Sequence, residues 1–220
     1  MADYVIKIKK AAIIFFGAIV VLFFLQVECF TADSPVGKLT FVQGVVTIKK
    51  DGIENKIIAR VGDSISSGNV LETRKNSRAQ VVLTDDSVII LSSGAALRVN
   101  QYAFEKKNDR RTAIIKVLEG KARFIVYKQR SKESSFKVET SHALISAGTG
   151  DFVAEVSDEE TEVAVLDGSV SVSNSFYLTV GKVWLGANQK IVVKEKTPPS
   201  GASVITSQQR RMYSKDAPHF

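Results

Sequence analysis

The side chains that most often carry out catalysis are few in this chain. It contains two histidines, His142 and His219, and one cysteine, Cys29. A hydrolytic site needs a nucleophile, a base and a group that orients the base, and no Gly-x-Ser-x-Gly motif supplies an activated serine. We therefore expect no catalytic residues and no enzyme activity. His142 precedes a predicted strand, and we interpret it as a hydrogen-bonded or solvent-exposed side chain.

Metal ligands and phosphate-binding loops are equally scarce. One cysteine and two distant histidines do not match the ligand spacing of zinc sites. The acidic run Asp158–Glu160 comes nearest to a calcium site, but it lies between two predicted strands and is interpreted as a hairpin turn. No glycine-rich loop opens a helix that would hold a phosphate group. The sequence therefore predicts no metal site and no cofactor.

The single tryptophan offers a different chemistry, the stacking of a sugar ring. Trp184 stands between Val183 and Leu185 in a predicted strand. A lone tryptophan among valine and leucine in a β-rich protein usually belongs to the core or its margin. We favour that interpretation over a carbohydrate platform.

The elements that position these residues follow a period of two from Leu39 onward. Short runs rich in β-branched residues alternate with glycine-bearing turns, which is typical of strands. The clearest runs are Val45–Ile48, Arg78–Leu83, Ala122–Tyr127, Phe136–Thr140, Thr161–Leu166, Ser169–Val172 and Lys190–Val193. Between them, the charged segment Phe104–Thr112 is predicted to be a solvated loop. We predict an all-β domain in which similar strand–turn–strand units stack side by side.

An apolar segment before this domain indicates its compartment. Ala11–Val27 is apolar apart from Gln26 and follows three lysines, and a spanning helix needs ~17 to 25 such residues. Lysines before the segment and none directly after it predict a C-terminus outside the cytoplasm. Cleavage as a signal peptide and retention as a transmembrane anchor both stay open, and we prefer retention. The expected location is periplasmic, with a tether to the inner membrane.

The net charge of the chain is +7, which leaves two interpretations of its surface. Positive charge outside the cytoplasm attracts anionic lipids and cell-wall glycans, but lysine also keeps β-rich surfaces soluble, and we prefer the second explanation. Lys128, Arg130 and Lys132 lie close together in one predicted loop and are the candidate contacts for an anionic glycan. No basic motif interleaved with aromatic residues suggests nucleic acid.

Several short segments of the sequence, taken in order, match the pattern of a known family. They are Gly44–Ile48, Val61–Ile65, Leu71–Thr73, Ser77–Ser87, Leu118–Gly120, Phe136–Thr140, Gly148–Thr149 and Val165–Val172. Together they resemble the FecR domain family of exported β domains, over about Val36–Val193. The resemblance implies a solenoid-like stack of short strands, of the β-helix or β-roll type, in which Asp63, Asp85 and Asp86 are turn residues.

The chain departs from the family pattern in two places. The family has Gly-Thr-x-Phe where this chain has Gly148-Thr149-Gly150-Asp151-Phe152, so we expect Gly150 to absorb one extra residue as a β-bulge. The regulators that name the family carry a cytoplasmic domain that binds a sigma factor. Only a short segment precedes Ala11–Val27, so we do not expect that activity here.

The resulting organisation has three parts. Residues 1–30 are predicted to be the signal peptide or anchor, residues 31–196 the FecR-like β domain, and residues 197–220 a flexible tail with little to bury. The expected function is that of an exported, envelope-associated protein-binding or scaffolding module with an envelope protein as its partner. Two alternatives remain: a module that binds peptidoglycan or another anionic glycan, and a component of transmembrane signalling.

Overall fold

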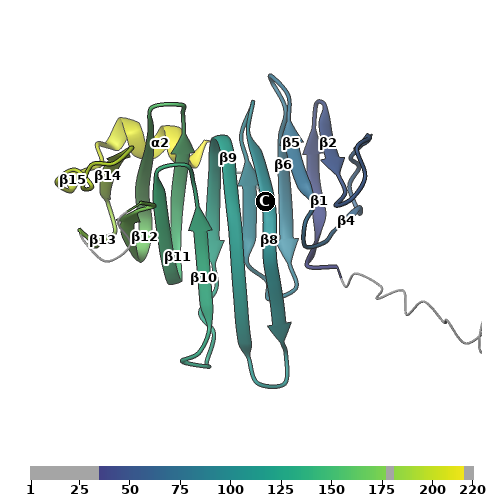
Figure 1. Ribbon diagram of the computed structural model, residues 1–220, viewed down its shortest axis with the longest axis horizontal. Helices are drawn as coiled ribbons and strands as arrows, with labels where there is room; N and C mark the ends of the chain where they lie inside the picture. Colours follow the sequence, from purple (N-terminus) through teal and green to yellow (C-terminus); the bar gives the residue numbers. More distant parts are fainter. Residues whose placement is uncertain (1–34, 177–180, 216–220) are drawn as a thin grey trace, which may run out of the picture. The chain divides into compact units, whose positions relative to one another are not determined.

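The computed structural model describes residues 35–176 and 181–215, which belong to one compact unit. In this part of the chain a 15-stranded sheet is accompanied by one short helix (Figure 1). The elements are β1 Gly37–Gln43, β2 Val46–Lys49, β3 Lys56–Ile58, β4 Ser64–Ile65, β5 Val70–Thr73, β6 Arg78–Leu83, β7 Val88–Leu91, β8 Ala96–Glu105, β9 Arg110–Val126, β10 Ser135–Glu139, β11 Ala143–Val156, β12 Glu160–Asn174, β13 Val183–Gly186, β14 Gln189–Lys194, β15 Ser203–Val204 and α2 Ser207–Ser214. The all-β prediction is confirmed.

The predicted N-terminal segment lies outside the described residues. Ala11–Val27, Cys29 and His219 all belong to stretches for which no placement is given. Within residues 35–176 and 181–215, the helical part of the chain is too short and too polar to cross a membrane.

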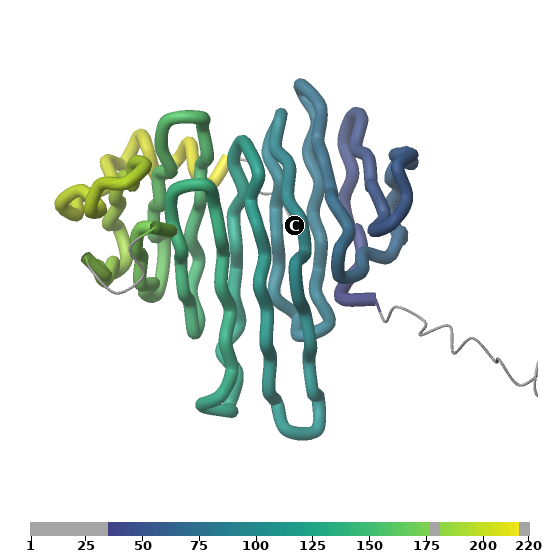
Figure 2. Tube along the Cα trace, viewed as in Figure 1, coloured from purple at the N-terminus to yellow at the C-terminus, as the bar shows by residue number. Residues whose placement is uncertain are grey.

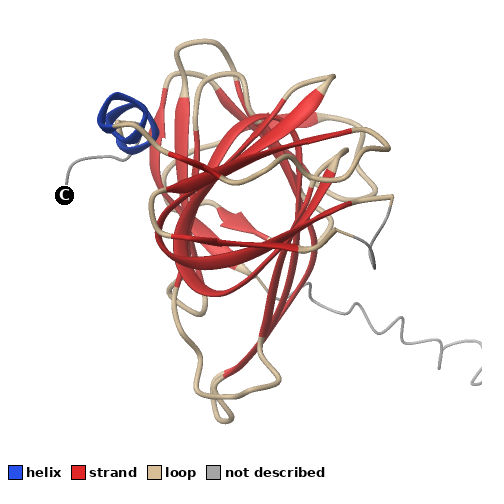
Figure 3. Ribbon diagram, turned by 90° about the vertical axis from the view of Figure 1, so that its left-hand side faces the viewer, coloured by secondary structure: helices blue, strands red, loops and turns tan. Residues whose placement is uncertain are grey.

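The sheet folds into two layers because three long strands bend and pass from one layer to the other. The first half of β9 pairs with β8 and β10, whereas its second half pairs with β7 and β11. The bend falls at Gly120, whose φ is +72°, and β11 and β12 bend together at Gly150 and Gly168. Figure 3 shows strands on both sides of a common interior.

One layer therefore runs in the order β3-β2-β5-β8-β9-β10-β11-β12-β13, and the other in the order β4-β1-β6-β7-β9-β11-β12-β14-β15. We call them the first and the second layer. Neighbouring strands are antiparallel except for β9 and β10, which are parallel. The chain advances along the stack nearly in sequence order, as the colours of Figure 2 show. Both layers end in strands whose outer edges are unpaired in the described part of the chain.

The core between the layers consists of side chains that alternate along each strand. Before its bend β9 points Ala113, Ile115 and Val117 inward, and after it Ala122 and Phe124. Phe124 stacks on Phe152, with ring centroids 5.2 Å apart, and meets Phe136 edge-on at 6.1 Å. Burial of each such ring contributes about 1.5–3 kcal/mol. The phenylalanine cluster therefore holds the two layers together.

The extra residue of the Gly148–Phe152 motif is absorbed in β11, but not at the predicted position. The pairing of β11 with β12 shifts its register between Ala147 and Thr149 and again between Asp151 and Phe152. Gly150 lies between the two shifts at a φ of +147°. The β-bulge expected at Gly150 therefore lies two residues earlier: Gly150 pairs with Gly168, whereas the register skips Gly148 in β11 and Leu166 in β12.

The charged segment Phe104–Thr112 differs from its prediction. β8 continues to Glu105 and β9 begins at Arg110, so only residues 106–109 form a turn. Arg111 is fully buried rather than solvated. The reason is a buried acidic partner, Asp85, which charge patterning along the sequence does not reveal.

The predicted tail also differs from its prediction in residues 203–214. These residues form β15 and α2, and a capping box closes the start of the helix, with Thr206 and Gln209 as its two partners. Ile205 and Tyr213 are buried against Val153, Ala164 and Leu166, which face outward from the second layer. The segment does bury side chains, because this outer face is apolar and requires a cover.

Candidate binding surfaces

A polar cluster is buried where the two layers meet. The Asp85 carboxylate accepts hydrogen bonds from Arg111 Nη1 at 2.5 Å, Ser87 Oγ at 2.8 Å and the Tyr102 hydroxyl at 2.8 Å. Arg111 also donates to the carbonyl oxygens of Tyr127 and Gly148, at 3.1 and 3.4 Å. The side chains of Asp85 and Arg111 are both 0% exposed. The cluster is therefore suited to cross-linking the layers and is closed to a ligand.

Tyr102 takes its acid–base behaviour from this cluster. Burial raises the pKa of its hydroxyl far above the ordinary value, and the charge of Asp85 raises the pKa further. Tyr102 therefore remains a neutral donor over the whole physiological range. The prediction that Asp85 is a turn residue is confirmed by its bond from the Ser87 N–H, but the ion pair was not foreseen.

The other candidate residues for chemistry have structural partners. His142 is buried directly before β11, and its Nδ1 lies 3.0 Å from Ser141 Oγ and 3.3 Å from Thr161 Oγ1. The interpretation of a hydrogen-bonded histidine at a strand start is confirmed. Asp158 and Glu159 lie in the hairpin turn between β11 and β12, as predicted, and Glu160 is the first residue of β12. Residues 35–176 and 181–215 contain no group of three His, Cys, Asp or Glu side chains arranged to hold a metal ion.

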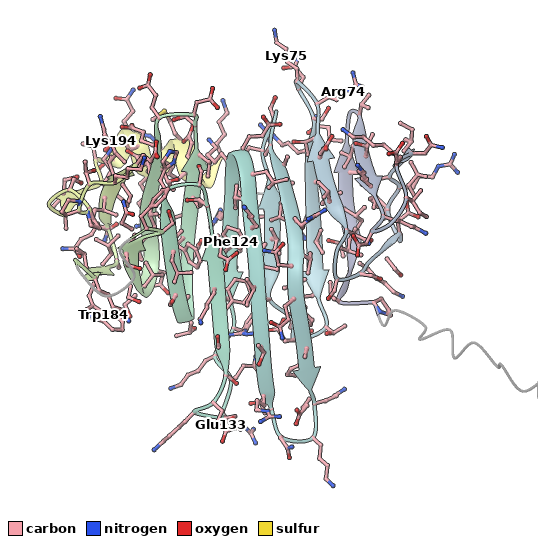
Figure 4. The ribbon with its side chains drawn as sticks, in the orientation of Figure 1. Arg74, Lys75, Phe124, Glu133, Trp184 and Lys194 are labelled. Atoms are coloured by element: carbon pink, nitrogen blue, oxygen red, sulfur yellow. The ribbon has the colours of Figure 1, made fainter. Side chains whose placement is uncertain are left out.

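Trp184 is not a core residue, and that interpretation is wrong. Its side chain is 67% exposed, and Figure 4 shows it at the margin of the sheet, away from the interior. Strand alternation explains the position, because Leu185 points into the core and its neighbour must point out. β13 is the last strand of the first layer, so no further strand covers the indole.

A groove crosses the outer face of the first layer beside Trp184. It has a volume of about 440 Å³ and is lined mainly by small residues of β10, β11 and β12 together with Lys182 and Trp184 of the segment around β13. The strand register places Lys137, Ser146, Ser171 and Trp184 in one row across four strands. The Lys182 ammonium lies 5.2 Å from the centroid of the indole ring. We call this surface the Trp184 groove.

Two basic loops project from one end of the central strands β8, β9 and β10. Lys128, Arg130 and Lys132 lie between β9 and β10, in the loop predicted for them, and the turn of Lys106 and Lys107 lies beside it. The loops are joined because the Arg130 N–H donates to Asp109 Oδ2 at 2.7 Å. In Figure 4 this end carries the labelled Glu133, which pairs with Arg110. All five lysine and arginine side chains belong to turns or loops, where an anion can approach them.

The end of the first layer opposite β13 carries exposed apolar side chains. β3 pairs with β2 alone, and all three of its residues are exposed. Ile58 is 63% and Val61 62% exposed, and Ile53 and Ile57 add to the same end. Unpaired backbone groups on an apolar edge strand form a template for another strand. We call this surface the β3 edge.

Three comparisons with known proteins bear on the family and the fold of this chain. Residues 69–171 match the family model described as FecR protein. The comparison with curated proteins finds no match. Two crystal structures, both described as a "putative anti-sigma factor" from Parabacteroides distasonis, have the same fold over part of their length.

The similarity to these structures is partial. One is 25% identical, covers 63% of this chain and gives a TM-score of 0.50, and the other is 23% identical with the same coverage and score. The chain spans 61% of the length of either protein. The resemblance to the FecR domain family that the motifs indicated is confirmed by the family model over residues 69–171.

Proposed function

We propose that this chain is an exported, envelope-associated FecR-domain protein without enzyme activity, which acts in regulation or signalling by binding another protein. The FecR match and the description of the Parabacteroides proteins support a regulatory role. The apolar segment Ala11–Val27 supports export and a membrane tether. Strands that follow one another along the stack support the solenoid-like interpretation of the scaffold.

The β3 edge is the observation that carries this proposal. Its outer N–H and C=O groups have no strand partner in the described part of the chain, and apolar side chains flank them. Ile57 lies opposite the buried Ile48 and Ile58 opposite Thr47, so the two isoleucines point to opposite faces of the sheet. The edge therefore suits an extended segment of a partner protein that adds one strand and contributes apolar side chains on both faces.

The first experiment captures the partner from crosslinked envelopes of cells that produce the full chain. Ile58→Lys places a charge on the apolar edge and should abolish recovery of the partner. Val204→Lys is a matched control, because Val204 is 74% exposed on β15 at the other end of the stack. Loss of the partner in both variants, or recovery of no reproducible protein, argues against docking at the β3 edge.

The location is tested separately. Fusion of a reporter enzyme that is active only outside the cytoplasm to the C-terminus of the full chain should give activity in whole cells. Washing membranes with carbonate should leave the protein in the pellet if the segment is retained as an anchor, and release it if the segment is cleaved. An inactive reporter in cells that contain the intact fusion protein contradicts export.

An anionic glycan is the second candidate partner, and the basic loops favour it. Lys128, Arg130 and Lys132 project next to Lys106 and Lys107, and attraction between exposed charges is screened by salt. The fraction of the protein that sediments with purified cell wall should therefore decrease steeply when NaCl is raised from about 50 to about 500 mM, which is roughly a tenfold range of ionic strength. If the amount of bound protein does not depend on the salt concentration, the loops do not have this role.

A further inference from the structure

The Trp184 groove has the composition of a sugar site rather than of a protein-docking surface. Its floor is formed by small residues of two strands, Ser146, Ala147 and Gly148 of β11 and Ser171 of β12, so the sheet surface stays low there. Ala147 and Ser171 are almost fully buried, and Ser146 is partly exposed. Trp184 rises at the end of this floor as the largest side chain of the row. The result is a hollow with hydroxyl groups along its floor and an aromatic ring at one side.

The backbone that carries the indole is fixed, and the ring is open to a ligand. Trp184 lies within the hydrogen-bonded strand β13, opposite Ser171, so its backbone is fixed although the side chain is 67% exposed. A pyranose ring has an apolar C–H face and a rim of hydroxyl groups. The apolar face can pack on the indole while the hydroxyl groups exchange hydrogen bonds with serine, which is both a donor and an acceptor.

Two cations lie around the groove. Lys182 lines it and places its ammonium 5.2 Å from the ring centroid of Trp184. Lys137 stands exposed in the same cross-strand row, opposite Ser146. The residues that line the groove include no carboxylate. A ligand with a negative charge therefore gains attraction from both lysines and meets no repulsion from the lining.

We propose that the Trp184 groove binds an acidic saccharide, whose pyranose ring stacks on Trp184 and whose carboxylate pairs with Lys182. The volume of about 440 Å³ lies within the range of small-ligand sites. This inference goes beyond the protein-binding role, because β13 and the β3 edge are the two opposite ends of the first layer. A partner protein and a saccharide can occupy the chain together.

The chain contains its own reporter for this test, because Trp184 is its only tryptophan. Tetragalacturonate should change the fluorescence of the full chain saturably, and neutral cellotetraose should bind at least tenfold more weakly. Lys182→Gln should weaken binding of the acidic sugar roughly tenfold and leave that of the neutral sugar unchanged. Soluble fragments of purified cell wall form a third arm and show whether the source is the wall or a free acidic polysaccharide.

Calorimetry of variants completes the test. Trp184→Ala should remove binding, and its circular dichroism should be unchanged because the side chain is exposed. Phe176→Ala is the matched control, since Phe176 is 55% exposed and Lys196 lies 5.7 Å from its ring centroid, but it does not line the groove. Unchanged binding in Trp184→Ala overturns the proposal, as does the absence of binding in all three arms. Binding lost only when Lys128, Arg130 and Lys132 are replaced assigns the glycan to the basic loops instead.

Discussion

Arg111 reaches from the start of β9 to Asp85, in the turn after β6, and their ion pair is fully shielded from water. The Arg111 guanidinium also lies 5.0 Å from the centroid of the Phe136 ring. Four donors saturate the carboxylate: the Arg111 guanidinium, the Tyr102 hydroxyl, the Ser87 hydroxyl and the Ser87 N–H. The pair is thus a fixed polar link between the two layers, in a region otherwise held by apolar packing.

Removal of one partner of this pair should be strongly destabilising. Arg111→Met leaves the Asp85 carboxylate buried without its counter-charge, and the expected loss is about 3–5 kcal/mol of the free energy of unfolding. Urea unfolding followed by circular dichroism measures it. Arg123→Met is the matched control, because Arg123 and Asp151 form a two-pronged pair at 2.6 and 2.8 Å that remains partly exposed. Its expected cost is about 1 kcal/mol, and equal losses in both variants contradict the special role of Arg111.

Because the Tyr102 hydroxyl is buried, we expect the free energy of unfolding to decrease in alkaline solution. Its folded-state pKa is raised above the ordinary 10.0 mainly by burial, so the folded protein keeps a proton that the unfolded chain releases. The stabilisation is complete below pH 10 and is lost as the pH rises beyond that value. The melting temperature should fall above pH 10, and less steeply in Tyr102→Phe. At pH 7 that variant loses the hydrogen bonds of the hydroxyl with Thr84 Oγ1, the Asp85 N–H and the Asp85 carboxylate, at about 1 kcal/mol each. Parallel alkaline curves for the two proteins rule out this coupling.

Gly120 should tolerate no side chain, because the bend of β9 depends on it. A Cβ at this position lies 2.5 Å from the carbonyl oxygen of Gly94, and φ is +72°. Backbone strain alone costs of order 1–3 kcal/mol, and the overlap adds to it. Gly52→Ala separates the two effects, since Gly52 has a φ of +69° but nothing within 4 Å. Gly120→Ala should lower the melting temperature clearly more than Gly52→Ala does. Equal decreases of the melting temperature in the two variants would mean that the close approach to Gly94 does not contribute.

The strands could be predicted because their signals are local, but their bends could not. The sequence predicts Thr161–Leu166 and Ser169–Val172 as separate strands, whereas both belong to the continuous strand β12. Alternation marks the core face of β9 and β12, and glycine marks the points where these strands turn. The Asp85–Arg111 pair could not be predicted in this way. Its members are 26 positions apart. Asp85 belongs to the turn between β6 and β7 and Arg111 to β9, and only the meeting of the two layers brings them together. The one local sign of such a pair is a charged residue at an inward-facing position of a strand, as Arg111 is two residues before the buried Ala113.

Trp184 and α2 show a second limit. Alternation tells which neighbours share a face, but it does not tell which of two apolar residues, Trp184 or Leu185, points inward. The continuous apolar run Val163–Leu166 did contain a signal, since a strand that is apolar on both faces is usually covered on both. The cover proved to be the C-terminal segment, whose own composition is too polar to indicate burial.

Tyr213 should control whether α2 stays docked on β12. Its ring is buried, its hydroxyl donates to the Glu162 carboxylate, and burial is the main cause that raises the pKa of this hydroxyl. Arg210 adds a bond to the Leu166 carbonyl oxygen at 3.0 Å. Tyr213→Ala should free the helix, so that trypsin cuts after Arg210 and Arg211 at least tenfold faster while the sheet melts at nearly the same temperature. Met212→Ala is the control, because Met212 is 51% exposed on the same turn. Equal cleavage of both variants means that Tyr213 does not hold the helix.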